Sequence, residues 1–300
     1  MTMRSNHISV CLCTFKRPAL LLRSLQGIAA QDTEGRFSYS IVVADNDGER
    51  SAEETVRNFA GTVRVQVEYC VEPQQNIALA RNKAIAADDG DFIAFIDDDE
   101  IPPADWLLRL YLTCEESNAD GILGPVLPHF DDPPPAWVTK GKFFVRPSHP
   151  TGYELSWSQC RTGNVLIRRR ILSIGEEPFL PQFGTGGEDV DFFRRMIAAG
   201  YVFRWCHEAP VHEVVPPSRS SARFLLRRAL LRGSNFPKQG AGRAKNLMKS
   251  LAAVPAYTLA LPVFAAIGQH LFLKYLIKLL EHVARILSLS GIHLVSERET

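Results

Sequence analysis

The stretch that decides the fold lies at residues 92–100 and reads Phe92-Ile93-Ala94-Phe95-Ile96-Asp97-Asp98-Asp99-Glu100. Five apolar residues predict a short strand that is buried on both faces, and four acidic residues follow where it ends. Asp97 and Asp99 can point to the same side and offer two oxygen ligands to a divalent cation. The alternative is a solvated acidic turn. Because like charge is unfavourable directly after an apolar strand unless a cation compensates it, the pattern favours a metal site.

The same alternation of strand and helix runs through the residues before this stretch. We expect strands at 8–13, 40–44, 63–70 and 92–96, and helices at 20–30, 52–59 and 77–87. Apolar strands that alternate with helices indicate an α/β protein whose mostly parallel sheet is covered on both sides. Ligands of such open sheets bind beyond the carboxyl ends of the strands, where the polar clusters 14–17, 45–47 and 97–100 fall.

The second half of the chain is less regular. Residues 125–150 are rich in Pro and aromatic residues, which predicts an ordered excursion rather than a regular element. A strand is expected at 163–168, and an amphipathic helix at 190–199. Acidic residues just before that helix favour its dipole, so their position alone is not evidence of catalysis.

The charge of the chain is distributed unevenly. Residues 1–213 carry 21 Lys+Arg and 30 Asp+Glu, whereas residues 214–300 carry 13 and 3, so the net charges are −9 and +10. A basic tail suggests a polyanionic partner, either nucleic acid or an anionic membrane surface. The apolar run 251–268 contains Pro255 and Pro262 and has basic flanks, which favours a re-entrant or interfacial hairpin and hence a membrane, not nucleic acid.

Two further features bear on the compartment. The six cysteines are scattered and form no C-x-x-C pair, so we interpret them as reduced core residues. Residues 1–7 are polar and lack the apolar stretch of a secretory signal. We therefore expect the body of the protein in the cytoplasm, at the inner face of the membrane.

Five segments, in this order, resemble the family 2 glycosyltransferases, and most of all the bacterial exopolysaccharide and succinoglycan-type enzymes. The segments are 10–18, 43–46, 76–82, 95–102 and 187–191. The resemblance covers about residues 7–235. It implies a GT-A fold over residues 1–215, with a donor half at about 1–125 and an acceptor half at about 126–215, followed by a membrane-associating helical region at 216–300.

The resemblance also implies the ligands of the donor half. The donor is a nucleotide-diphosphate sugar, often uridine-linked, and the cofactor is a divalent metal, Mn²⁺ or Mg²⁺. Thr14 and Arg17 line the nucleotide pocket, Asp45 contacts the base or ribose, and Arg81 lies toward the diphosphate. The donor-binding set further includes Asn76 and Asp98. Asp97 and Asp99 form the D-x-D pair, Asp97 nearer the ribose and Asp99 on the metal.

For catalysis, the resemblance implies that Asp189 is the general base, which takes the proton of the acceptor hydroxyl in a single inverting displacement. Glu188 and Asp191 are candidates to support or replace it. His212 matches a metal-ligating histidine of some relatives, and a structural role is the alternative. Gly163 and Asn164 match a loop on the acceptor side, and a turn before a strand is the alternative.

The predicted function is therefore sugar transfer to a glycan or lipid-linked acceptor in surface polysaccharide synthesis. Two other classes remain open: a membrane-associated scaffold that has lost turnover, and a nucleotide-sugar pyrophosphorylase. The second normally carries a Gly-rich loop after the first strand, and residues 13–17 contain no Gly. The chain departs from the common family pattern at 45–48 and at Ala78, which affects the identity of the donor.

Overall fold

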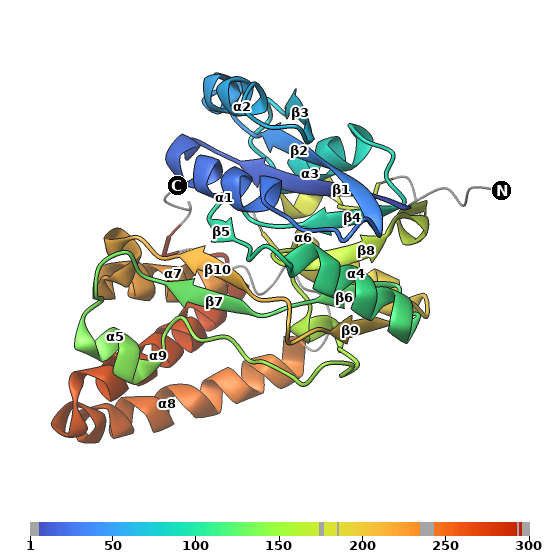
Figure 1. Ribbon diagram of the computed structural model, residues 1–300. Coiled ribbons are helices and arrows are strands. Elements are labelled where there is room, and N and C mark those ends of the chain that lie inside the picture. The colour runs from blue at the N-terminus through green and yellow to red at the C-terminus, as the bar shows by residue number, and fades with distance from the viewer. Residues whose placement is uncertain (1–5, 174–176, 185, 235–242, 293, 296–300) are drawn as a thin grey trace. The chain divides into compact units, whose positions relative to one another are not determined.

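The computed structural model describes residues 6–173, 177–184, 186–234, 243–292 and 294–295. The chain forms two compact units (Figure 1). Met1–Leu127 and Arg146–Val214 make the first unit, and Pro128–Val145 and Val215–Thr300 make the second. The excursion that we expected within the acceptor half thus packs with the C-terminal helices.

A mostly parallel sheet forms the centre of the first unit. In spatial order its strands are β3 (Gln66–Val71), β2 (Phe37–Asp45), β1 (Asn6–Thr14), β4 (Phe92–Phe95), β8 (Val165–Arg168), β6 (Gly121–Leu123) and β9 (Phe203–Trp205). Strands β1 to β4 run parallel to one another, whereas β8 runs antiparallel to both of its neighbours, β4 and β6. The amino end of β8 therefore lies at the same edge as the carboxyl end of β4.

Helices cover both faces of this sheet because its strands are apolar on both sides. On β1, Val10 and Leu12 face one core cluster and Cys11 faces the other. The first cluster is closed by α1 (Pro18–Ala29), α2 (Glu53–Ala60) and α4 (Trp106–Ser117). The second is closed by α3 (Ile77–Ala86) and α6 (Glu188–Ala198). The predicted α/β class with a covered, mostly parallel sheet is confirmed.

A small second sheet and several short helices complete the connections. The sheet has the order β5 (Glu100–Ile101), β10 (Val211–Val214), β7 (Val126–His129). The short helices are α5 (Ala136–Gly141), η1 (Trp157–Gln159), η2 (Arg169–Ser173), η3 (Pro181–Phe183) and η4 (Pro217–Ser220). Because β7 and α5 fall within 125–150, the prediction of an excursion without regular elements was wrong there.

The second unit is helical. It contains α7 (Ala222–Ser234), α8 (Arg243–Ile267) and α9 (Gln269–Leu289), with α9 packed against both of the others. Gly233 permits a close approach of α7 to α9, since a Cβ there would lie 2.5 Å from the carbonyl oxygen of Glu281. We expected the apolar run 251–268 to form a hairpin, but it does not fold back on itself. It continues as one helix through Pro255 and Pro262, and the chain reverses only at Gly268.

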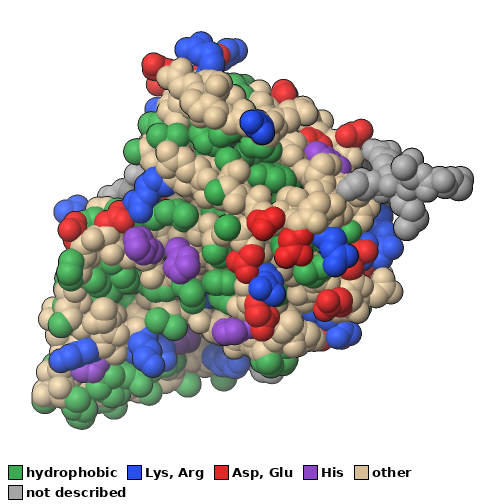
Figure 2. Space-filling model, viewed as in Figure 1, with side chains coloured by type: hydrophobic (Ala, Val, Ile, Leu, Met, Phe, Trp, Pro, Cys, Tyr) green, Lys and Arg blue, Asp and Glu red, His purple; other side chains and the backbone are tan. Residues whose placement is uncertain are grey.

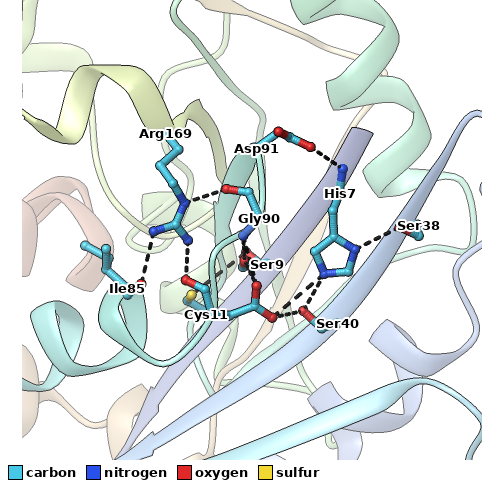
Figure 3. Close-up of polar contacts among 10 residues, drawn as sticks. His7, Ser9, Cys11, Ser38, Ser40, Ile85, Gly90, Asp91 and Arg169 are labelled. Atoms are coloured by element: carbon cyan, nitrogen blue, oxygen red, sulfur yellow. Dashed lines mark hydrogen bonds and ion pairs between the residues drawn. The ribbon is translucent and has the colours of Figure 1, made fainter. Parts of the chain in front are cut away.

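A polar network braces the sheet at the edge opposite the acidic residues (Figure 3). The Asp88 carboxylate accepts hydrogen bonds from the hydroxyls of Ser9, at 2.7 Å, and Ser40, and from the backbone N–H of Gly90, at 2.9 Å. His7 Nε2 lies 3.8 Å from it. Burial alone raises the pKa of Asp88, but these hydrogen bonds outweigh burial and hold that pKa below its ordinary value.

We expect Asp88→Asn to lower the free energy of unfolding by about 1–3 kcal/mol at pH 7, because buried donors lose their charged acceptor. A depressed carboxyl pKa stabilises the fold above the unfolded-state value of about 3.9, and this contribution is lost as the pH falls through the lower folded-state value. Urea unfolding at pH 7 and pH 3 measures both effects. Asp89→Asn, at an exposed neighbour, is the control. Equal stability of both variants at pH 7 would contradict this assignment.

Candidate active site

The predicted site residues meet at one edge of the sheet because of its topology. The parallel strands β1, β2 and β4 deliver Thr14, Asp45 and Asp97 to their carboxyl ends. Strand β8 begins at the same edge, since Val165 pairs with Phe95. This places the loop before β8 against the acidic loop after β4.

The acidic run folds into a tight turn with its carboxylates in different places. The side chain of Asp97 remains 46% exposed, whereas Asp98, Asp99 and Glu100 are buried. Glu100 Oε2 accepts the backbone N–H of Asp97 at 3.1 Å, and the Asp99 carbonyl accepts the N–H of Val214 at 2.7 Å. The turn is therefore held from β10 as well as from within.

Crowding within this turn changes its acid–base properties. Desolvation by the surrounding protein and the nearby Asp99 raise the pKa of Asp97, Arg81 lowers it, and the net result is a pKa of about 6, even though solvent still reaches part of the side chain. Burial also raises the pKa of Asp98 to about 6, against the effect of Arg17. Burial and the nearby Asp97 raise the pKa of Glu100. These carboxylates are costly to ionise together without a cation.

Asp98 points back toward the first strand. Its carboxylate accepts the Thr14 hydroxyl at 2.7 Å and lies 3.5 Å from Arg17 Nη1, which is also 3.5 Å from Asp99. Thr14 and Arg17 are thus joined to the acidic turn at the carboxyl end of β1. Through these contacts Asp98 orients the loop that follows β1.

Arg81 connects the acidic turn to the helix that carries the predicted base. Its guanidinium is 9% exposed, pairs with Glu188 Oε1 and lies 3.9 Å from Asp97 Oδ1. The Phe179 ring covers it at 5.6 Å. Burial alone lowers the pKa of Arg81, but Glu188 and the other acids more than compensate, so the residue stays charged.

The start of α6 presents its acids in three different environments. Glu188 is buried against Arg81. Asp191 is held by Arg194 and Arg195 of its own helix, at 3.1 and 2.7 Å, which indicates a structural role. Asp189 is partly exposed, and its Oδ1 accepts the N–H of Val190 at 2.7 Å. Of the three, Asp189 is the one that is accessible to solvent.

Two of the predicted donor-binding residues hold loops together. The Asp45 carboxylate, fully buried, accepts the N–H groups of Asp47 and Ala52 and the hydroxyl of Tyr69. Asn76 caps α3 by accepting the N–H groups of residues 78 and 79, and its amide donates to the Pro181 carbonyl. The cap fixes the start of the helix that carries Arg81.

Gly163 and Asn164 lie directly behind the acidic turn. A Cβ on Gly163 would lie 2.8 Å from Glu100 Oε1 and 2.9 Å from Asp97 Oδ2, so only glycine fits without displacement. Asn164 has φ 59° and is fully buried. Its amide oxygen accepts the Trp106 indole N–H at 2.7 Å, and its amide nitrogen donates to the carbonyls of Pro125 and Ala209. Its side-chain groups are thus used within the protein.

The structure adds two residues that sequence reasoning did not select. Arg146, from the loop before η1, pairs with Glu213 of β10, and Glu213 lies opposite Glu100 in the β5–β10 pairing. Their charges also shift the pKa of Asp97, which Arg146 lowers and Glu213 raises. No local motif marks either residue, because their proximity arises from the pairing of β10 with β5.

The residues at this turn fit a hard divalent cation with few protein ligands. Among the described residues, no group of three or more His, Cys, Asp or Glu side chains is close enough together to hold a metal ion. His212 is exposed on β10. Within the same part of the chain, Glu100 Oε1 and Glu188 Oε2 are buried and have no hydrogen-bond partner. Mg²⁺ in particular is commonly held by one or two carboxylates plus substrate phosphates. Asp97 and Asp99 supply such a pair.

The chain belongs to glycosyl transferase family 2, whose model matches residues 9–173. Over 248 residues it is 36% identical to the succinoglycan biosynthesis protein ExoM of Rhizobium meliloti (strain 1021), covering 81% of this chain and 78% of ExoM. It is 26% identical over 215 residues to the glycosyltransferase AglE of Haloferax volcanii, covering 69% and 67%. Membership favours the transferase over the pyrophosphorylase.

Solved structures show the same fold. TarS 1-349 of S. aureus matches with a TM-score of 0.53 at 14% identity, covering 96% of this chain and 93% of that one. Its complex with UDP matches with a TM-score of 0.52 at 14% identity, covering 98% and 94%. Against a longer TarS structure, at 17% identity and a TM-score of 0.52, the match covers 75% of this chain and 39% of TarS. The predicted GT-A fold is confirmed.

We expect Gly163→Ala to fold normally but to lose at least about 100-fold in turnover, because the new methyl displaces Asp97 and Glu100 and small misplacements at reacting groups carry that cost. Release of nucleotide from a sugar-nucleotide donor measures turnover. Gly61→Ala is the matched control, since its Cβ would meet only backbone carbonyls at 3.6 Å or more. Full activity of Gly163→Ala would show that this contact is unimportant.

Proposed function

We propose that the protein is an inverting, metal-dependent transferase that moves a sugar from a UDP-sugar to a glycan or lipid-linked acceptor in surface polysaccharide synthesis. ExoM, by its name a succinoglycan biosynthesis protein, supports the pathway class, and the complex of TarS with UDP supports the nucleotide. The single observation that carries the mechanism is the Arg81 bridge between Asp97 and Glu188. It joins the donor end of the sheet to the helix that presents Asp189.

In this proposal the two sides of the bridge act on the two substrates. Asp189 accepts the proton of the acceptor hydroxyl while the hydroxyl oxygen forms a bond to the anomeric carbon. The bond from that carbon to the diphosphate oxygen breaks at the same time, and the diphosphate leaves with the electron pair. Attack opposite the leaving group inverts the anomeric centre. Glu188 holds Arg81, whose charge lies toward the departing diphosphate.

Asp97 and Asp99 would hold Mn²⁺ or Mg²⁺, which supplies positive charge against the leaving diphosphate. The raised pKa of Asp97 and its like-charged neighbours support a cation at this position. His212 remains a predicted further ligand. Arg17 and Thr14 hold the Asp98 carboxylate at the loop after β1, so Asp97 and Asp99 are the acids of this run that would bind the metal.

The test is nucleotide release from a panel of UDP-sugars in detergent, with and without Mn²⁺. We expect metal-dependent turnover by the wild type, loss of that turnover in Asp99→Ala, and a fall of about 10²–10⁴-fold in Asp189→Asn with donor binding retained. Asp89→Asn, exposed and outside the site, should match the wild type. Donor binding without turnover by the wild type would favour the scaffold, and metal-independent turnover would remove the metal from the mechanism.

We also propose that the second unit docks on the cytoplasmic membrane surface. One helix of the described chain, Leu247–Ile267, is long and apolar enough to cross a membrane by length and composition. Its outward stripe includes Leu251, Leu259, Val263 and Ile267, which are 50–80% exposed and spaced by four or eight residues. Figure 2 shows hydrophobic side chains along the lower edge of the view, where α8 lies in Figure 1.

The charge around this stripe suits anionic lipid. Lys249, Lys274 and Lys278 are exposed on α8 and α9, and no acidic residue occurs between Glu213 and Glu281. Each basic residue near an anionic surface contributes about 1 kcal/mol. An apolar stripe with basic flanks is typical of a helix that lies in the interface. A position at the membrane suits an enzyme whose acceptor is anchored in lipid.

We expect Leu259→Glu to weaken binding to phosphatidylglycerol-containing vesicles by at least about tenfold, because its carboxylate cannot enter the apolar layer cheaply. Co-sedimentation with vesicles measures the bound fraction. Asn58→Glu adds the same charge at an exposed position of α2 and should bind like the wild type. Unchanged binding of Leu259→Glu would refute docking through α8.

A further inference from the structure

An exposed indole stands out on the segment before β8. Leu155 and Cys160 are buried in the core cluster that contains Phe192 and Phe193 of α6. Between these two anchors the chain loops outward as η1, which packs against α6. Trp157 opens this turn, and 42% of it is exposed. The fold thus fixes both ends of the turn and leaves a large aromatic ring on its outer side.

The turn is rigid. The side-chain oxygen of Gln159 accepts hydrogen bonds from the N–H and the hydroxyl of Ser156, at 2.9 and 2.7 Å. Its amide nitrogen lies 3.2 Å from a ring nitrogen of His149. Arg161 donates to the carbonyl of Ser158 at 3.1 Å. Because folding already orders this turn, a ligand bound on the indole loses little further conformational freedom.

The turn is connected to both the helix that carries the proposed base and the loop beside the acidic turn. The helix it packs against begins with Glu188 and Asp189. Burial raises the pKa of the Cys160 thiol, and the charge of Asp189 adds to this rise. In the other direction the chain reaches Gly163, where an added Cβ would collide with the carboxylates of Asp97 and Glu100. Gly163 lies six positions after Trp157 in the chain, which limits the distance between their Cα atoms to about 20 Å.

The chemistry of the turn matches a sugar ring. One face of a pyranose carries C–H groups that pack on an aromatic ring, and its rim carries hydroxyls that need polar partners. Trp157 offers the apolar face, and its exposed chain neighbours Ser156 and Ser158 carry hydroxyls. We propose that Trp157 is the platform on which the acceptor sugar lies while Asp189 takes its proton. This inference rests on the proposed function and specifies its acceptor site.

The platform is tested by binding, which does not depend on turnover. Cellobiose and lactose are titrated against the full chain in the presence of UDP and followed by saturation-transfer NMR. We expect saturable binding to the wild type, an increase in Kd of about three- to tenfold in Trp157→Ala and Trp157→Leu, and a Kd within about twofold of wild type in Trp157→Phe. The leucine variant keeps an apolar side chain without a ring and is therefore the matched control for stacking.

Two results would overturn the proposal: no saturable binding of either disaccharide to the wild type, or binding by Trp157→Leu as tight as that of the wild type. UDP binding by Trp157→Ala and Trp157→Leu at wild-type affinity shows that their loss of disaccharide binding does not arise from misfolding. UDP affinity should be equal in all variants, because the turn lies outside the donor half. If no UDP-sugar is turned over but disaccharide binding still depends on the ring, the proposed function fails and the platform stands.

Discussion

The buried ion pair between Arg81 and Glu188 is the interaction on which the site depends. Each partner alone would be a charge in a poorly hydrated interior, so neither is stable there without the other. Arg81 reaches this position because Asn76 caps its helix and Phe179 covers its guanidinium. Through its contact with Asp97 the same guanidinium ties the acidic turn to the start of α6. The acidic turn and the start of α6 are thus held by one guanidinium group.

Much of the fold could be predicted from the sequence because β1, β2 and β4 are largely apolar on both faces and the first four strands alternate with helices. The bounds of β1, β4 and α3 differ from the predicted ones by one or two residues at most. The short elements β5, β9 and β10 could not be predicted, since two to four residues carry no periodicity of their own and exist only through pairing. Helix α8 was misjudged because Pro255 and Pro262 weaken a helix locally, whereas packing against α9 supports it along its length.

Sequence reasoning selected most residues of the candidate site, but it did not predict the contacts that each of them makes. Sequence spacing predicts that Asp97 and Asp99 lie close together. It does not predict that Asp98 turns toward Thr14, or that the Asn164 side chain makes three hydrogen bonds within the protein. Arg146 and Glu213 carry no motif and gain their place from strand pairing. Trp157 is apparent only once its exposure beside α6 is known.

The reversed direction of β8 has a consequence for how such enzymes diversify. Because β8 enters the sheet from the catalytic edge, the connection that precedes it crosses that edge and is secured by Leu155, Cys160 and Gly163. Residues between these attachment points can change in length and composition while β1 to β4 keep their pairing. Under the proposed function, the segment that meets the acceptor can therefore vary while the strands that carry the donor site stay the same.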